Sequence, residues 1–179
     1  MSQDFTEDRL LFSFPDDWIL CRPQDTSYYT RHFQTFCDGC KEMDFLAFDP
    51  GANVLWLIEV KDYRVHPRTK QKDLADEVAC KTRDVLALLL AGGIRDNAGS
   101  FSGKVQICKF WEQAKNVRGI RVVLHCELPS SPPSKLFPGI KDAANLQTKL
   151  AQKMRCIDPH AMFTSLSHSC ALAWTVREI

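Results

Sequence analysis

The amino-acid sequence predicts one compact α/β domain, residues 1–179, in which helices flank a mixed central β-sheet. A chain of 179 residues that is 45% hydrophobic is long and apolar enough to bury a core. Amphipathic helical patterns alternate with short apolar runs, and a turn-forming stretch joins two of those runs into a hairpin. Strands interspersed with helices favour a mixed sheet that the helices cover.

The expected elements can be placed in chain order. They are a packed lead-in through Leu20, a helix over 27–36 capped by Asp25 or Thr26, hairpin strands over 45–48 and 54–58, a helix over 73–91 ended by Gly92 and Gly93, strands over 105–110 and 120–128, a helix over 140–154 and a terminal strand over 171–179. We expect the core of the domain at about 26–128, with the C-terminal helix and strand within 135–179.

Charge and composition limit the classes of partner. The formal net charge is +1, so affinity for nucleic acid must come from a local patch. The acidic N-terminus does not resemble a signal peptide, and no apolar run is long enough to span a bilayer. Eight cysteines lack a disulfide-framework spacing, which is typical of reduced thiols. We therefore expect a cytoplasmic protein without a membrane partner.

The hairpin contains a charged constellation. Its turn, 49–53, has the sequence Asp-Pro-Gly-Ala-Asn, whose residues favour a tight reversal. If Asp49 and Val54 close the turn, Asp44 lies opposite Glu59, with their Cβ atoms roughly 5 Å apart. Glu59 and Lys61 are two residues apart and share a face of their strand. Two carboxylates and an ammonium should therefore converge, and the carboxylates should repel unless a cation or proton lies between them.

Asp44 followed by the triplet Glu59-Val60-Lys61 resembles the PD-(D/E)xK nuclease superfamily, in which an Asp on one strand and an acidic-x-Lys triplet on the next lie between two helices. The resemblance covers residues from about 28 to 91 and implies a restriction-endonuclease-like fold. It implies that Asp44, Glu59 and the Val60 carbonyl bind Mg²⁺, with Mn²⁺ as a substitute. Lys61 would position the attacking water and stabilise developing charge, so Asp44, Glu59 and Lys61 would be the catalytic residues. The implied activity is endo- or exonucleolytic cleavage of DNA in preference to RNA, in defence or DNA processing.

The sequence departs from the superfamily pattern at two places. Met43 stands where a proline often precedes the Asp, and no acidic residue lies between Ser27 and Cys37 in the expected first helix. Asp25, Asp38 and Glu42 are the candidate substitutes, although Glu42 lies opposite Lys61 and is expected to form a cross-strand ion pair. A charged strand end without a metal, and a catalytically inactive nucleic-acid or protein-binding module of the same fold, are therefore alternative interpretations.

A basic segment follows the hairpin. Arg64, Arg68, Lys70 and Lys72 lie in a stretch without an acid, directly after the carboxylates, where a phosphate backbone would have to lie. We expect these four residues to bind nucleic acid, the alternative being an ordinary solvated loop. Lys81, on the following helix, could face the site or water, and water is the favoured expectation.

Two further expectations concern zinc and assembly. Cys37 and Cys40 have the spacing of a zinc-ligand pair, but no second pair completes a site, so two free cysteines at a glycine turn are favoured. Nucleases that cut both strands are often dimers, so the partners to consider are DNA, a second copy of the chain or another protein.

Overall fold

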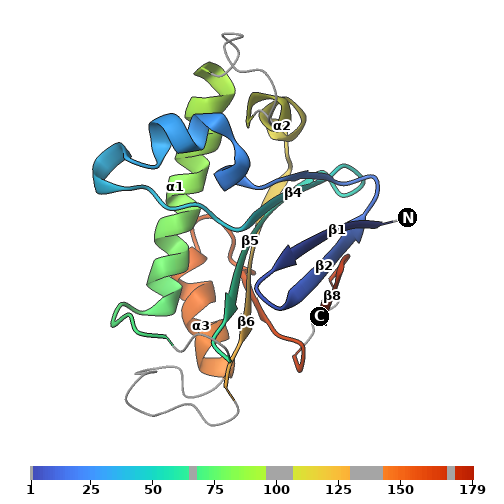
Figure 1. Ribbon diagram of the computed structural model, residues 1–179, viewed down its shortest axis with the longest axis vertical. Coiled ribbons are helices and arrows are strands. Elements are labelled where there is room, and N and C mark those ends of the chain that lie inside the picture. The colour runs from blue at the N-terminus through green and yellow to red at the C-terminus, as the bar shows by residue number, and fades with distance from the viewer. Residues whose placement is uncertain (1, 65–67, 96–106, 130–142, 169–171) are drawn as a thin grey trace.

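The computed structural model describes residues 2–64, 68–95, 107–129, 143–168 and 172–179. Figure 1 shows helices against one face of a central five-stranded sheet and a three-stranded sheet against its other face. The helices are α1 (Leu74–Arg95), α2 (Ile107–Ala114) and α3 (Ala143–Met154). The predicted α/β fold with a mixed, helix-flanked sheet is confirmed.

The central sheet has the strand order β3-β4-β5-β6-β7. The pairs β3–β4 and β4–β5 are antiparallel, whereas the pairs β5–β6 and β6–β7 are parallel. The strands are β3 (Ile19–Cys21), β4 (Phe45–Asp49), β5 (Val54–Asp62), β6 (Gly119–Glu127) and β7 (Met162–Thr164). The parallel crossover from β5 to β6 contains α1 and α2, which places α1 over the sheet face that carries the hairpin's charged residues.

The predicted hairpin register is confirmed. Phe45 pairs with Ile58, and Asp49 pairs with Val54 at the turn. Asn53 takes a positive φ of 55°, a conformation that asparagine tolerates better than most residues. The same register places Asp44, one residue before β4, across from Glu59 on β5.

The second sheet joins the two ends of the chain. It has the order β1-β2-β8, with β1 (Ser2–Glu7), β2 (Leu10–Pro15) and β8 (Thr175–Glu178). The lead-in through Leu20 is therefore a hairpin followed by β3, and the expected terminal strand is present within the described residues 172–179. One apolar cluster fills the space between the sheets, and it includes Phe12, Phe14, Phe45, Ile58, Val60 and Trp174.

Helix α1 continues through Gly92 and Gly93, so the prediction that they end it is wrong. Both glycines lie where α2 packs closely on α1. A Cβ on Gly92 would lie 2.6 Å from Cγ2 of Ile107, and one on Gly93 would lie 2.1 Å from Cδ1 of Trp111. The glycines thus permit close helix packing instead of capping the helix.

The strand predicted over 105–110 is also wrong, because residues 107–114 form helix α2. Ile107, Phe110 and Ala114 are buried at helical spacing, and the polar residues between them are more exposed. Residues 105 and 106 lie outside the described residues.

The remaining helix predictions are largely confirmed. The hydroxyl of Thr26 accepts a hydrogen bond from the Tyr29 N–H at 3.3 Å, but the first helix is short and ends in a π-helical turn, Tyr29–Phe33. Tyr29 and Phe33 in this turn are buried, whereas Phe36 is 55% exposed. In α3, Leu146, Leu150 and Met154 are buried at helical spacing, and Ala143 is half-buried. Residues 140–142 of that prediction, and 130–139 before them, are not among those described.

Candidate active site

The charged residues of β5 face helix α1. Along this strand Leu57, Glu59 and Lys61 share one face, while Ile58 and Val60 point into the core between the sheets. The Glu59 side chain is completely buried, with 0% of its surface exposed. A carboxylate thus occupies a position that the apolar pattern of the strand would assign to the helix-side core.

Two lysines form ion pairs with the same carboxylate oxygen of Glu59. The Nζ of Lys61 lies 2.5 Å from Glu59 Oε1, and the Nζ of Lys81 on α1 lies 2.6 Å from the same atom. The expectation that Lys81 faces water is therefore wrong. Within the described part of the chain, the other oxygen, Glu59 Oε2, is buried without a hydrogen-bond partner. An unpaired carboxylate oxygen in this position is costly unless a cation or donor reaches it.

Asp44 is fixed to the same strand through the backbone of Val60. The Val60 N–H donates a hydrogen bond to Asp44 Oδ2 at 2.7 Å, and Lys61 Nζ donates to the Val60 carbonyl at 2.9 Å. The predicted convergence of Asp44, Glu59 and Lys61, with Val60 between them, is therefore present.

The electrostatics follow from burial and close charges. Burial and then the charge of Asp44 raise the pKa of Glu59 to about 7, although Lys61 and Lys81 oppose the rise. Burial lowers the pKa of Lys61, but Glu59 and Asp44 outweigh it, so that this pKa is raised overall. The surroundings therefore favour the charged form of Lys61 and disfavour the charged form of Glu59.

Two other carboxylates lie near the site. Glu42 accepts a hydrogen bond from the Tyr29 hydroxyl, and Lys61 pairs with Glu59, so the expected ion pair between Glu42 and Lys61 is not the one observed. Glu7 on β1 was not predicted. Burial, and next the charge of Asp44, raise the pKa of Glu7, which also pairs with Arg22. The sequence gives no sign that Glu7 lies near Asp44, because the packing of the second sheet on the first brings the two residues together.

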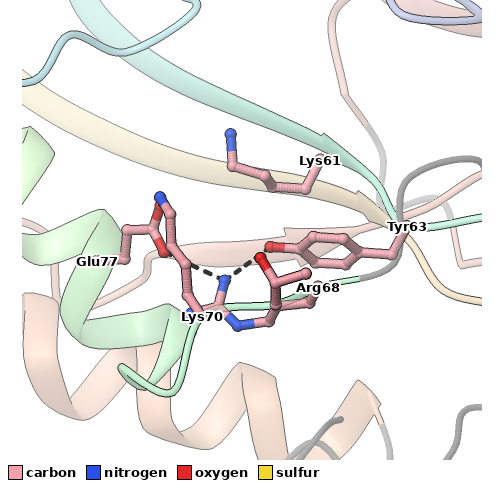
Figure 2. Close-up of a pocket in the computed structure, with 6 residues that line it drawn as sticks. Lys61, Tyr63, Arg68, Lys70 and Glu77 are labelled. Carbon is pink, nitrogen blue, oxygen red and sulfur yellow. Dashed lines mark hydrogen bonds and ion pairs between the residues drawn. The ribbon is translucent and has the colours of Figure 1, made fainter.

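The two arginines of the basic segment are held by the protein itself. Arg64 donates two hydrogen bonds to Asp62, from Nε to Oδ1 at 3.0 Å and from Nη2 to Oδ2 at 2.8 Å. Arg68 is only 6% exposed, and its Nη1 donates to the Tyr63 hydroxyl at 2.8 Å and to Glu77 Oε2 at 3.1 Å. Figure 2 shows Arg68 between these two residues. Their contacts give both arginines a structural role.

The two lysines of the segment are exposed. Lys70 Nζ lies 2.6 Å from Glu77 Oε1, and Lys72 Nζ lies 3.1 Å from the Cys80 sulfur. Both line a hollow of about 350 Å³, which we call the lysine pocket. Its lining residues are Lys41, Glu42, Lys61, Lys70, Lys72, Glu77, Cys80 and Lys81. A smaller hollow of about 160 Å³ adjoins it at Lys61, Lys70 and Glu77 (Figure 2). Lys61 and Lys81 line the lysine pocket and also contact Glu59, so the pocket lies next to the candidate site.

No group of three or more His, Cys, Asp or Glu side chains within the described residues is close enough to hold a metal ion by itself. Cys37 is exposed, whereas Cys40 is buried and its sulfur lies 3.4 Å from the Phe36 carbonyl oxygen. Asp44 and Glu59 are the two carboxylates that face each other across the hairpin.

Comparisons with known proteins give one relevant similarity. A cysteine–tRNA ligase from Neisseria meningitidis serogroup A is 31% identical over an alignment of 199 residues, which covers 91% of this chain and 27% of the ligase. The chain thus spans about a quarter of the length of this enzyme. No protein-family model and no solved structure matches the chain. Of the helices in the described residues, none is long and apolar enough to cross a membrane.

Proposed function

We propose that this chain is a metal-dependent nuclease of the PD-(D/E)xK superfamily that hydrolyses phosphodiester bonds of DNA in preference to RNA, in defence or DNA processing. One observation carries the proposal: the buried carboxylate of Glu59, which leaves Oε2 without a partner among the described residues, lies beside Lys61 and across from Asp44. A buried carboxylate next to a second one is destabilising on its own, and a bound cation relieves that cost.

The residues fit a Mg²⁺ ion, for which Mn²⁺ can substitute. Mg²⁺ takes oxygen ligands and commonly uses one or two protein carboxylates, with water and substrate phosphate completing its shell. Asp44, Glu59 and the Val60 carbonyl would hold the ion, and Glu59 Oε2 is an oxygen with no competing partner in the described residues. When bound, Mg²⁺ polarises the phosphate and lowers the pKa of a coordinated water.

The chain's own groups would supply positioning and charge. Lys61 is held by Glu59 and the Val60 carbonyl, so its ammonium is fixed where it can orient the attacking water and stabilise charge that develops on phosphate. Lys81 holds Glu59 from the helix side, and the Val60 N–H fixes Asp44. These contacts keep the three catalytic side chains in place before substrate arrives.

The test is a cleavage assay on single- and double-stranded DNA and RNA in Mg²⁺, Mn²⁺ or EDTA. Wild type should cut DNA only when metal is present, and Glu59→Gln and Lys61→Ala should each lose about 100-fold or more in rate. Glu112→Gln is the matched control, because Glu112 is an exposed carboxylate on α2 that pairs only with Lys115 among the described residues. If pure wild type cuts none of the substrates with either metal, the proposal fails.

A second candidate is a tRNA-binding module without nuclease activity. It is favoured by the similarity to a cysteine–tRNA ligase over 91% of the chain. The lysine pocket supplies cations that can contact an RNA backbone. Binding of tRNA with a steep salt dependence, while the RNA and all DNA substrates stay intact in Mg²⁺, would favour this candidate over the nuclease.

A further inference from the structure

The lysine pocket carries an excess of positive charge. Its lining includes five lysines and two glutamates, for a formal charge of +3. Three of the lysines are already paired: Lys61 and Lys81 with Glu59, and Lys70 with Glu77. The other two lysines of the lining form no such ion pair among the described residues.

Lys41 and Lys72 are those two. Across the described residues, neither ammonium forms an ion pair with a carboxylate, and the contact of Lys72 is to the sulfur of Cys80, a weak acceptor. Glu42, the remaining carboxylate of the lining, accepts a hydrogen bond from Tyr29. Glu42 keeps its negative charge, because the Tyr29 hydroxyl is neutral, but it pairs with neither lysine. The exposed ammoniums of Lys41 and Lys72 thus border one hollow without a carboxylate partner among the described residues.

The size of the pocket limits which anion can bind there. A volume of about 350 Å³ lies at the small end of the range for ligand sites. A hollow of this size can take one phosphate with its attached sugar. An ammonium on a flexible stem binds phosphate as a point charge, which suits a single phosphate approached from two sides.

The charge distinguishes the two kinds of phosphate in a nucleic-acid strand. A phosphate monoester carries about 1.5 to 2 negative charges at pH 7, whereas each backbone phosphodiester carries one. Two unpaired ammoniums therefore match a monoester better than a diester. Monoesters occur in a strand only at its ends.

We propose that the lysine pocket binds the terminal phosphate monoester of a nucleic-acid strand, with Lys41 and Lys72 as its main contacts. This deepens the proposed nuclease function and rests on it, because it assigns a phosphorylated strand end to the pocket beside Glu59. The residues that select the end differ from the arginines of the basic segment, which are held by Asp62, Tyr63 and Glu77.

The test is fluorescence anisotropy with one labelled oligonucleotide made with a 5′-phosphate, a 3′-phosphate or hydroxyl ends, measured in EDTA. One of the phosphorylated forms should bind about tenfold more tightly than the hydroxyl form. Lys41→Gln and Lys72→Gln should each reduce this preference several-fold. Lys109→Gln, an exposed lysine on α2 outside the pocket, should leave it unchanged. Equal affinity for all three oligonucleotides, or an equal loss in the Lys109 variant, would overturn the proposal.

The EDTA condition separates this proposal from the nuclease. Cleavage in Mg²⁺ without any preference for phosphorylated ends overturns the terminal-phosphate site alone. A preference for phosphorylated ends without cleavage overturns the nuclease alone. Because Lys41 and Lys72 are exposed, both variants should keep the wild-type melting temperature. If one of the variants unfolds at a lower temperature, the affinities of wild type for the three oligonucleotides still test the preference for a phosphorylated end.

Discussion

Glu59→Gln should stabilise the metal-free protein above neutral pH. Burial, followed by the charge of Asp44, raises the pKa of Glu59 from 4.5 to about 7 in spite of Lys61 and Lys81. A difference of about 2.5 in pKa corresponds to about 3 kcal/mol against the ionised form at pH 8. Glutamine has nearly the same shape and cannot ionise, so the variant avoids this cost.

The pH dependence has a defined sign. The folded protein holds a proton on Glu59 at a pH where the unfolded chain has released it. The resulting stability is complete below about pH 4.5 and is lost as the pH rises through about 7. The Glu59→Gln variant should not show this loss.

Urea unfolding in EDTA at pH 5 and pH 8 measures the effect. Between the two pH values, the free energy of unfolding of Glu59→Gln should rise by about 2 to 3 kcal/mol relative to wild type, because a small part of the effect is already present at pH 5. The titration of the other groups cancels in the comparison. The side chains of Lys61 and Lys81 keep 23% and 13% exposure, so both can reach water when the carboxylate is lost. If the variant is less stable than wild type at pH 8, the ion pairs to Lys61 and Lys81 outweigh the cost of burying the Glu59 carboxylate, which would contradict this prediction.

Three further changes test the packing and charges around the site. Gly93→Ala should lower the free energy of unfolding by about 2 kcal/mol in chemical denaturation, because its Cβ would lie 2.1 Å from Trp111 Cδ1. Gly119→Ala is the control and should change little, because a Cβ there would have no atom within 4 Å. Equal effects of the two changes would contradict the close packing of α2 on α1. Arg68→Ala should cost about 2 kcal/mol, because it removes a buried partner of Glu77, and a neutral result in the same assay would count against the structural role of Arg68. The hydrogen bonds from Arg64 lower the pKa of Asp62, so this carboxylate stabilises the protein above about pH 4 and its contribution is lost on acidification. Asp62→Asn should therefore lower the melting temperature at pH 7 more than at pH 3, and an equal loss at both would argue against that contribution.

The hairpin could be predicted from sequence because its determinants are local. The turn from Asp49 to Asn53 fixes the register, and the period of two then places Asp44 across from Glu59 and puts Lys61 on the same face as Glu59. The helix pattern of α3 is likewise carried by Leu146, Leu150 and Met154 at helical spacing.

The errors arose where distant residues decide the structure. Gly92 and Gly93 have the local signature of a helix end, but Trp111 and Ile107 pack against them and the helix continues. A six-residue apolar pattern at 105–110 did not distinguish a strand from the start of α2.

The side chains that surround the candidate site could not be predicted either, because they come from elements distant in the sequence. Lys81 reaches Glu59 only because α1 packs over β5, and Glu7 approaches Asp44 through a separate sheet. Arg68 has the sequence context of a solvated cation, yet Glu77 from α1 and Tyr63 bury it.

Asp44 and Glu59 are proposed to form a site for one divalent cation. Titration of the metal-free chain with Mn²⁺, followed by electron paramagnetic resonance of the free ion, measures this directly. One Mn²⁺ should bind per wild-type chain, and this binding should be lost in Asp44→Asn and Glu59→Gln and retained in Glu112→Gln. No binding to wild type at millimolar Mn²⁺, or binding that both Asp44→Asn and Glu59→Gln retain, would contradict this proposal.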